Sequence, residues 1–251
     1  MTFLRETSIV FNRQLRMNLR NPAWVIIGLM QPVLYLALFG PLLESFAPML
    51  GTDNAYMVFV PGLLIQLGIF GALFAGFSLI SEWRSGVIEA ERVTPASRTA
   101  LLLGRVLRDS VQLAVQGIVL IALGFAFGLR GSIGGMLIGL LITIALGTAC
   151  ASASNALALT TKSEDVMAPL INSVALPVLL LSGILIPMSV GPQWLQTISD
   201  FVPTKHIVEA VRAVFAGDFA NGVVYWGIGW TAVLVALGLW AGTRTFRKEN
   251  A

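Results

Sequence analysis

The 251-residue chain has a single cysteine, Cys150, and a single histidine, His206. No disulfide within the chain can form, and no His/Cys set of zinc ligands can be assembled. The three lysines follow Thr161, Thr204 and Arg247, whereas a phosphate-binding loop of the G-x-x-x-x-G-K-[ST] type needs glycine before its lysine. We therefore expect the chain to hold no metal, to bind no ATP by that device and not to be an enzyme.

Charged residues are also scarce, at 12% of the chain, which is about half their share in a typical soluble domain. Hydrophobic residues make up 56%, and most fall in six apolar runs, each near or above the ~20 residues that cross a hydrocarbon core. The runs cover residues 23–43, 56–80, 102–128, 133–160, 167–190 and 223–243. The sequence predicts an all-α membrane protein with six transmembrane helices and one transmembrane domain over residues 1–251.

Basic residues are divided unequally between the two sides of these six runs. Thirteen of the sixteen lysines and arginines fall on the side of the termini, and the others are Arg130, Lys205 and Arg212. With the acids included, the net charges of the two sides are +5 and −2. Because basic loops stay in the cytoplasm, we expect both termini to be cytoplasmic. The positive balance indicates contact with anionic membrane lipids and gives no indication of nucleic-acid binding.

Three segments outside the runs have helical patterns of their own. Residues 1–21 place apolar side chains on one face and arginines on another, as in a helix that lies in the membrane interface. Residues 82–98 form the largest charged loop on the side of the termini, and a short amphipathic helix ending before Pro95 fits them. Residues 191–217 hold two apolar stripes separated by Pro203, which predict two short helices at the outer surface.

Two patterns inside the runs bear on helix packing. Gly135 and Gly139 have the GxxxG spacing, which favours a close helix contact but does not distinguish a contact within the chain from one between two copies. The fifth run contains Pro169, Pro177 and Pro187, which predict a broken helix.

No run carries an acidic or basic residue near its middle, which argues against an ion-coupled transporter. Uncharged polar residues do occur there, and the candidates for a substrate path are Gln66, Gln112, Gln116, Asn155 and Asn172. Such groups more often join helices by hydrogen bonds than line a conduit, and both interpretations stay open. A path built on them would be mostly apolar, which suits a hydrophobic or amphiphilic passenger.

The loop at residues 82–98 carries a more specific pattern. It supplies Glu82, Gly86, Glu89, Thr94, Pro95, Ser97 and Arg98, followed by Gly104 and Arg105. This order resembles the cytoplasmic loop of ABC-2 type ABC-transporter permeases, which reads approximately E-x-x-x-G-x-x-E-x-x-x-x-T-P-x-S-R and then G-[KR]. The second half is similar to the same family at Leu181-Ser182-Gly183, Pro187, Trp194-Leu195, Pro203-Thr204 and Arg212.

This resemblance implies a permease in the cytoplasmic (inner) membrane, paired with a second copy or a paralogue. It also implies two separate ABC ATPase subunits, which bind ATP and Mg²⁺, so that this chain itself holds no cofactor. The expected contacts with the ATPase are Glu82, Arg84, Glu89, Glu91, Arg92, Thr94 and Pro95.

The passenger is less restricted by the resemblance. Short six-span members look most like daunorubicin-resistance-type drug exporters, which implies efflux of a hydrophobic or amphiphilic, drug-like molecule and hence multidrug or antibiotic resistance. Two alternatives stay open. One is an exporter of a lipid or a lipid-linked polysaccharide, and the other is a membrane scaffold that resembles a permease without transporting anything.

Overall fold

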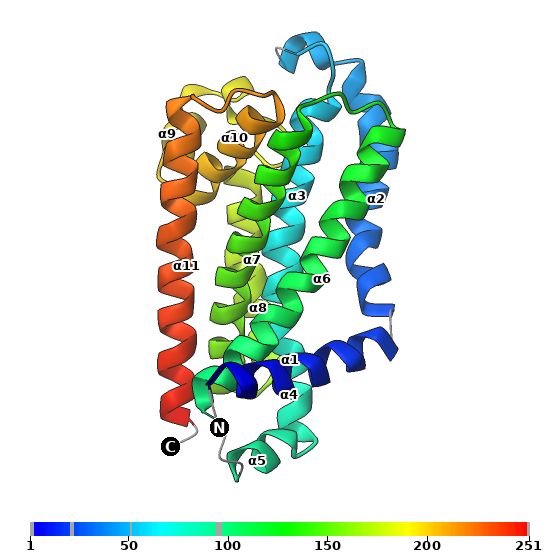
Figure 1. Cartoon of the computed structure of the whole chain (residues 1–251). Coiled ribbons are helices and arrows are strands. Elements are labelled where there is room, and N and C mark those ends of the chain that lie inside the picture. The colour runs from blue at the N-terminus through cyan, green and yellow to red at the C-terminus, as the bar shows by residue number, and fades with distance from the viewer. Residues whose placement is uncertain (1–2, 21–22, 51, 94–96, 250–251) are drawn as a thin grey trace.

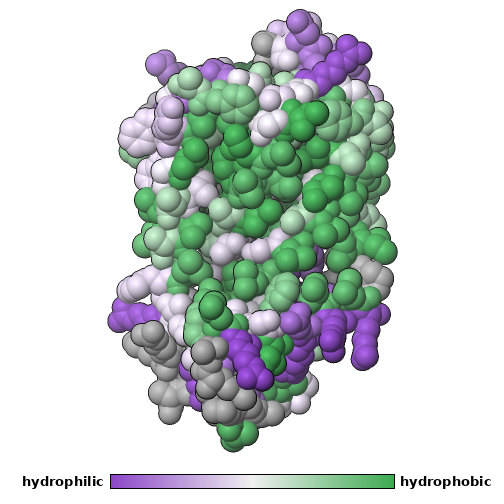
Figure 2. All heavy atoms as spheres, in the orientation of Figure 1, coloured by the Kyte–Doolittle hydropathy of each residue, from purple (hydrophilic) through white to green (hydrophobic). Residues whose placement is uncertain are grey.

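The computed structural model describes residues 3–20, 23–50, 52–93 and 97–249, and every regular element in these ranges is a helix. Six spans are long and apolar enough to cross a membrane. They are α2 (Ala23–Glu44), α3 (Tyr56–Leu73) continued by α4 (Ala75–Arg84), α6 (Arg98–Ala126), α7 (Ile133–Thr161), α8 (Glu164–Leu181) and α11 (Gly222–Glu249). The spans form one bundle (Figure 1), and apolar side chains make a broad band between two more polar ends (Figure 2). The chain is a multi-pass membrane protein of the all-α class.

The shorter helices lie at the two ends of the bundle. α1 (Phe3–Arg20) crosses its foot, α5 (Val87–Arg92) lies below the bundle at the same end, and α11 ends there too (Figure 1). We call this the basal end. The opposite, distal end holds η1 (Ala47–Leu50), η2 (Met188–Val190), α9 (Gln193–Asp200) and α10 (Pro203–Phe215). Helices are thus present in all three segments where the sequence predicted them.

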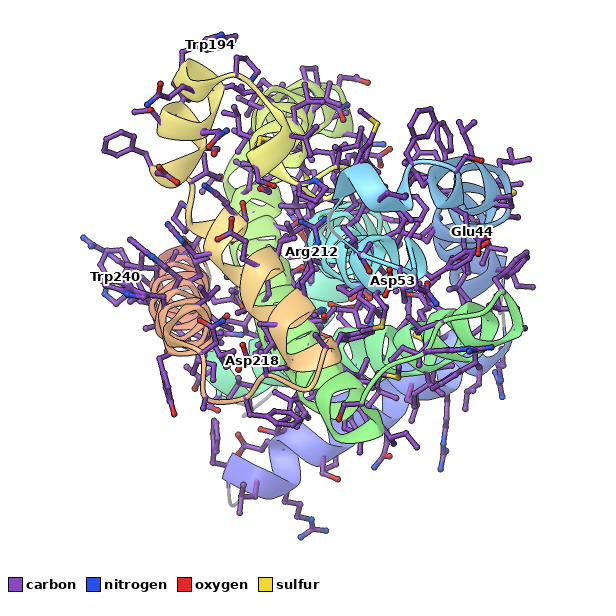
Figure 3. All side chains as sticks on the ribbon, turned by 90° about the horizontal axis from the view of Figure 1, so that it is seen from above. Glu44, Asp53, Trp194, Arg212, Asp218 and Trp240 are labelled. Atoms are coloured by element: carbon purple, nitrogen blue, oxygen red, sulfur yellow. The ribbon has the colours of Figure 1, made fainter. Side chains whose placement is uncertain are left out.

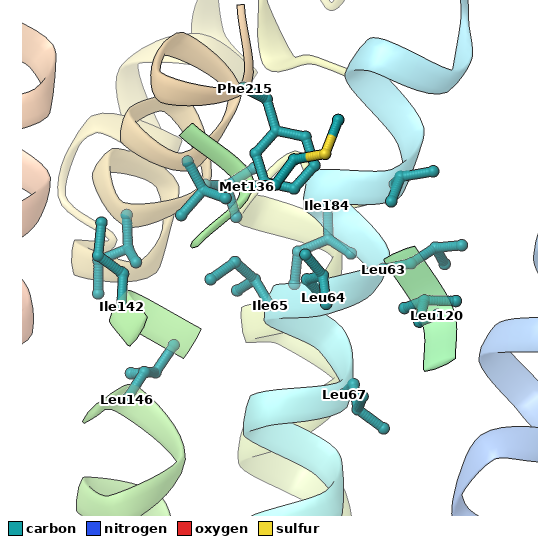
Figure 4. Close-up of a cluster of buried hydrophobic side chains, with 14 of the residues drawn as sticks. Leu63, Leu64, Ile65, Leu67, Leu120, Met136, Ile142, Leu146, Ile184 and Phe215 are labelled. Carbon is teal, nitrogen blue, oxygen red and sulfur yellow. The ribbon is translucent and has the colours of Figure 1, made fainter. Parts of the chain in front are cut away.

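α3 is the central helix of the bundle. Every residue from Phe59 to Ile69 is buried, because α3 is apolar on all sides and is surrounded by other helices. Its leucines meet Leu120 of α6 and Ile142 and Leu146 of α7 in the main hydrophobic cluster (Figure 4).

Glycines on α7 bring α10 close to the bundle. A Cβ on Gly135 would lie 1.7 Å from the carbonyl oxygen of Val214, and one on Gly139 would lie 2.6 Å from the ring of Phe215. Both glycines of the GxxxG pattern therefore face α10 of the same chain. The pattern is a contact within the chain.

The fifth run departs from its predicted length, because α8 ends at Leu181 and not near residue 190. Two of its three prolines lie inside the helix. The helix ends just before Gly183, which has a φ of +67°, a conformation that favours glycine and commonly terminates helices. The carbonyl oxygens of Gly183 and Ile184 accept hydrogen bonds from the Arg212 guanidinium. This side chain holds the turn that follows the helix, which periodicity alone did not indicate.

The second span is interrupted at Phe74, between α3 and α4. Ser154 of α7 reaches this point, where its hydroxyl group donates to the carbonyl oxygen of Leu73 and accepts from the amide of Gly76 at 3.1 Å. A side chain inserted between two helical segments is a recognised cause of a helix break. α4 is therefore a separate helix at the basal end. It is held to α7 and does not continue the backbone hydrogen-bond pattern of α3.

Candidate functional site

A group of charged side chains is buried at the basal end, with Arg105 of α6 at its centre. Only 2% of Arg105 is exposed. Its Nη2 donates to Oε2 of Glu82 on α4 at 2.6 Å and to Oε2 of Glu91 on α5 at 2.9 Å. One guanidinium group therefore joins three helices that meet below the bundle.

α1 joins the same carboxylates from the other side. Nη1 of Arg13 donates to Oε1 of Glu91 at 3.0 Å, and Nε2 of Gln14 donates to Oε1 of Glu82 at 2.9 Å. Each carboxylate thus connects α1 with α6. We call Arg13, Gln14, Glu82, Glu91 and Arg105 the Arg105 cluster.

A second set of polar contacts continues the cluster along α6. Arg108 pairs with Asp109 (Nε to Oδ1, 2.9 Å) and donates to Oδ1 of Asn18 on α1 at 3.3 Å and to Oγ of Ser78 on α4 at 3.4 Å. Nδ2 of Asn18 also donates to Oε1 of Gln112 at 3.0 Å. Asn18 is thus the residue of α1 that bonds directly to the polar stripe of α6, whereas Arg13 and Gln14 reach α6 through Glu91 and Glu82.

The cluster is a costly way to join helices. Taking charges out of water is unfavourable, and a buried ion pair often contributes little net stability compared with apolar side chains of similar volume. Nε and Nη1 of Arg105 are also buried without an acceptor among the described residues. Removing a single partner would leave an opposite charge uncompensated, at a cost of about 3–5 kcal/mol. The arrangement is therefore better suited to fixing the positions of helices than to maximising stability.

α5 has one anchored face and one free face. Ile88 is buried against the basal hydrophobic cluster, which includes Leu79 and Val106, and Glu91 enters the Arg105 cluster. Glu89 is exposed, and Val93, just past the helix, is 87% exposed. Gly86 precedes α5 with a φ of +76°, so glycine is favoured where the chain turns into the helix.

The structure separates the predicted ATPase contacts into two groups. Glu82 and Glu91 turn inward and bind Arg105, so their carboxylates face the chain's own helices. Glu89 is exposed, and Arg84 is exposed and pairs with Glu164 at 3.2 Å. Arg92 belongs to α5, with a side chain outside the described set, and Thr94 and Pro95 lie outside the described residues.

The predicted path residues differ in burial and in hydrogen bonding. Gln66, Gln116 and Asn155 are almost fully buried among the helices, and Nε2 of Gln116 donates to the carbonyl oxygen of Val25 on α2 at 3.0 Å. Gln112 is half-buried and bound to Asn18. Asn172 is the exception, because it is exposed on α8. Two of the five thus join helices by hydrogen bonds within the chain.

Sequence reasoning named Arg105 only as part of the family pattern and did not identify it as the centre of a cluster. A signal for it was present. Asp109, Gln112 and Gln116 form a polar stripe on α6, and Arg105 extends the stripe by one helical turn toward the basal end. The acidic partners come from residues 82–91, and only the fold brings them to this stripe.

At the distal end, Arg212 joins α10 to two other segments (Figure 3). Its Nε donates to the carbonyl oxygen of Val58 on α3 at 3.0 Å, and its Nη2 donates to the carbonyl oxygen of Gly183 at 2.7 Å. The guanidinium of Arg212 therefore attaches α10 to the central helix through hydrogen bonds to uncharged backbone carbonyl groups.

Comparison with known proteins places this architecture among transporters. Residues 5–216 match a family model described as ABC-2 type transporter. A daunorubicin resistance ABC transporter permease protein, DrrB1 of Streptomyces coeruleorubidus, is 26% identical over 237 residues, covering 92% of this chain and 82% of the relative. The candidate transport permeases ycf38 of Cyanophora paradoxa and Porphyra purpurea are 27% and 28% identical, covering 85% and 83% of this chain and 75% of each relative.

Proposed function

This chain belongs to the ABC-2 type transporter family, and we propose that it is the permease subunit of an exporter driven by ATP hydrolysis on separate ABC ATPase subunits. Six apolar spans supply the membrane domain. No phosphate-binding loop of the G-x-x-x-x-G-K-[ST] type is present, so the nucleotide and Mg²⁺ are bound by the partner. The surplus of basic residues at the basal end supports a cytoplasmic location for that end, where the ATPase would work.

The observation that carries the proposal is the two-sided placement of α5. A helix that binds a moving partner needs an exposed face for the partner and a firm attachment to the spans. α5 has both, since Glu89 and Val93 face outward while Ile88 and Glu91 are buried. We assign Glu89, Val93 and Arg84 to the ATPase contact, with Arg92, Thr94 and Pro95 completing it. Glu82 and Glu91 hold the contact in position from inside.

The same geometry gives a route for the motion. When the ATPase moves α5, the Glu91–Arg105 ion pair moves α6 as well, and Arg13 carries the displacement into α1. α4 can tilt relative to α3, because the helix is already broken at Phe74. The basal helices and α6 then move together against the buried α3 core.

A second copy of the permease completes the complex in this proposal. α2 and α8 pack least against the rest of the chain, and α8 presents Asn172 and Ser173 on its exposed surface. Amide and hydroxyl groups at membrane depth are better placed against protein or water than against lipid tails. We assign this surface to the second copy and to the passenger's path between the copies.

The passenger in this proposal is a hydrophobic or amphiphilic small molecule. The similarity to a daunorubicin resistance permease supports it, and so does the mostly apolar exposed surface of α8. Drug-stimulated ATP hydrolysis by the purified complex in vesicles would support this assignment. Stimulation by lipids or lipid-linked sugars instead would indicate the alternative passenger, and no stimulation by any of these compounds would favour the scaffold.

The experiment for the coupling role compares two charge reversals at the basal end. Glu89→Lys changes the free face of α5, whereas Asp165→Lys changes an equally exposed acid at the start of α8. We expect Glu89→Lys to weaken binding of the ATPase about tenfold or more, since like charges at an interface are costly, and to reduce ATP-driven transport in vesicles. Equal ATPase binding by the two variants would refute the assignment of α5.

A further inference from the structure

A cavity of about 280 Å³ opens at the distal end between α10, the η2 loop and the start of α11. Arg212 and Glu209 of α10 supply its charged groups, and apolar side chains such as Met188 and Val223 supply part of its wall. Its volume lies just below the ~300–1,000 Å³ typical of pockets for drug-sized ligands. The cavity therefore suits a small, polar group better than a drug-like passenger.

Arg212 brings a positive charge that no described carboxylate pairs with directly. Nε and Nη2 donate to three backbone carbonyl oxygens, whereas Nη1 has no acceptor among the described residues. Burial lowers the pKa of Arg212 to about 10, partly offset by Glu209, so the group stays charged at neutral pH. Arg212 is only partly buried and lines the cavity, so an anion there could accept a hydrogen bond from Nη1.

Glu209 brings a negative charge one helical turn before Arg212. Its carboxylate is partly exposed, and the nearest cation is Nζ of Lys205 at 3.7 Å. Lys205 also binds Asp200 more closely, so Glu209 keeps acceptor capacity for a ligand. Glu209 and Arg212 lie three residues apart on α10, so both side chains project from the same side of the helix and line the cavity.

The position of the cavity indicates where its ligand comes from. Tyr225 and Trp226 lie two and three residues after the cavity residue Val223 at the start of α11, and both are strongly exposed. Exposed aromatic side chains with a polar tip gather at the level of the lipid head groups. The opening of the cavity therefore lies close to the head-group layer of the outer leaflet.

We propose that this cavity binds a zwitterion made of a phosphate and a primary ammonium group. The phosphate accepts from Nη1 of Arg212, and the ammonium donates to the carboxylate of Glu209. This is the chemistry of a phosphatidylethanolamine head group and of free phosphoethanolamine. Binding of this zwitterion does not require ATP-driven transport, so it can be tested apart from the proposed function.

The test measures lipid binding to the purified chain in detergent by native mass spectrometry. Phosphatidylethanolamine should bind about tenfold more tightly than phosphatidylglycerol or phosphatidylcholine, the factor that one hydrogen bond to a charged group contributes. Glu209→Gln, a change at a partly exposed side chain, should remove this preference. Asp53→Asn, at an exposed distal carboxylate outside the cavity lining, should keep it. Equal binding of the three lipids, or a full preference in Glu209→Gln, would overturn the proposal.

Two further measurements test the phosphate contact and the source of the ligand. Arg212→Gln should weaken binding of phosphatidylethanolamine and phosphatidylglycerol alike, because both present a phosphate. As Arg212 also supports the distal fold, Glu209→Gln is the deciding variant. Displacement of the lipid by soluble phosphoethanolamine would assign the site to the free zwitterion, and displacement by diacyl lipid alone would assign it to the membrane.

Discussion

Replacing Arg105 with methionine tests the basal cluster most sharply. Arg105 is 2% exposed and is bound by Glu82 and Glu91, whose side chains are themselves about nine-tenths buried. Without the guanidinium, both carboxylates remain in a site of low polarity. Gln14 and Arg13 compensate them only in part, because Arg13 is about half exposed and lies in a more polar setting. We therefore expect Arg105→Met to lower the free energy of unfolding by about 3–5 kcal/mol.

A triple variant, Glu82→Gln/Glu91→Gln/Arg105→Met, separates stability from coupling. It removes the buried charges together, so most of the lost stability should return, as replacing a whole buried ion network is often nearly neutral. The ion pairs that attach α5 and α4 to α6 remain absent, so stimulation of the partner ATPase by the passenger should stay low. Both quantities are measurable in micelles, by denaturant titration followed by tryptophan fluorescence and by ATPase assay.

Arg130→Met is the matched control, because Arg130 is exposed at the distal end. It should change stability by no more than about 0.5 kcal/mol. The reasoning is refuted if Arg105→Met is as stable as this control. It is also refuted if the triple variant couples ATP hydrolysis to the passenger as well as the native chain does.

Two close helix contacts give further predictions. Gly62→Ala places a Cβ 1.9 Å from the carbonyl oxygen of Ile184, so it should sharply lower the midpoint of thermal unfolding; Gly222→Ala, which meets nothing within 4 Å, should not, and equal midpoints would contradict the packing. Gly104→Leu intrudes on Val10 of α1, whose Cγ1 lies 2.6 Å from a Cβ at that position. It should loosen α1 and speed amide hydrogen exchange along that helix, and unchanged exchange would contradict the contact.

Much of the fold could be predicted because membrane spans leave a simple trace in sequence. A run of ~20 apolar residues is readable without knowing any tertiary contact, and α2, α7 and α11 began within a residue of their predicted starts. The end of α8 could not be read in the same way. The apolar run continues to residue 190, but the helix stops at Leu181, because Gly183 turns the chain. Arg212, 29 residues further on, binds the carbonyl oxygen of Gly183 and holds this turn.

The sequence identified the segment that holds the candidate site, but it did not give the spatial arrangement of the side chains in it. The pattern of residues 82–98 predicted a short amphipathic helix, and α5 lies there. Which acids face outward depended on Arg105, since its position on α6 turns Glu82 and Glu91 inward and leaves Glu89 exposed. Whether an acidic side chain is buried against a basic one depends on the tertiary structure, so the sequence pattern of a single loop cannot reveal it.

The location of α5 can be measured directly with one engineered thiol. Glu89→Cys in a Cys150→Ser background leaves a single cysteine on the free face of α5. In sealed cells, a membrane-impermeant maleimide should leave this cysteine unlabelled. In permeabilised cells it should label the cysteine, and bound ATPase should protect it. Labelling from outside intact cells, or equal labelling with and without the ATPase, would contradict the account.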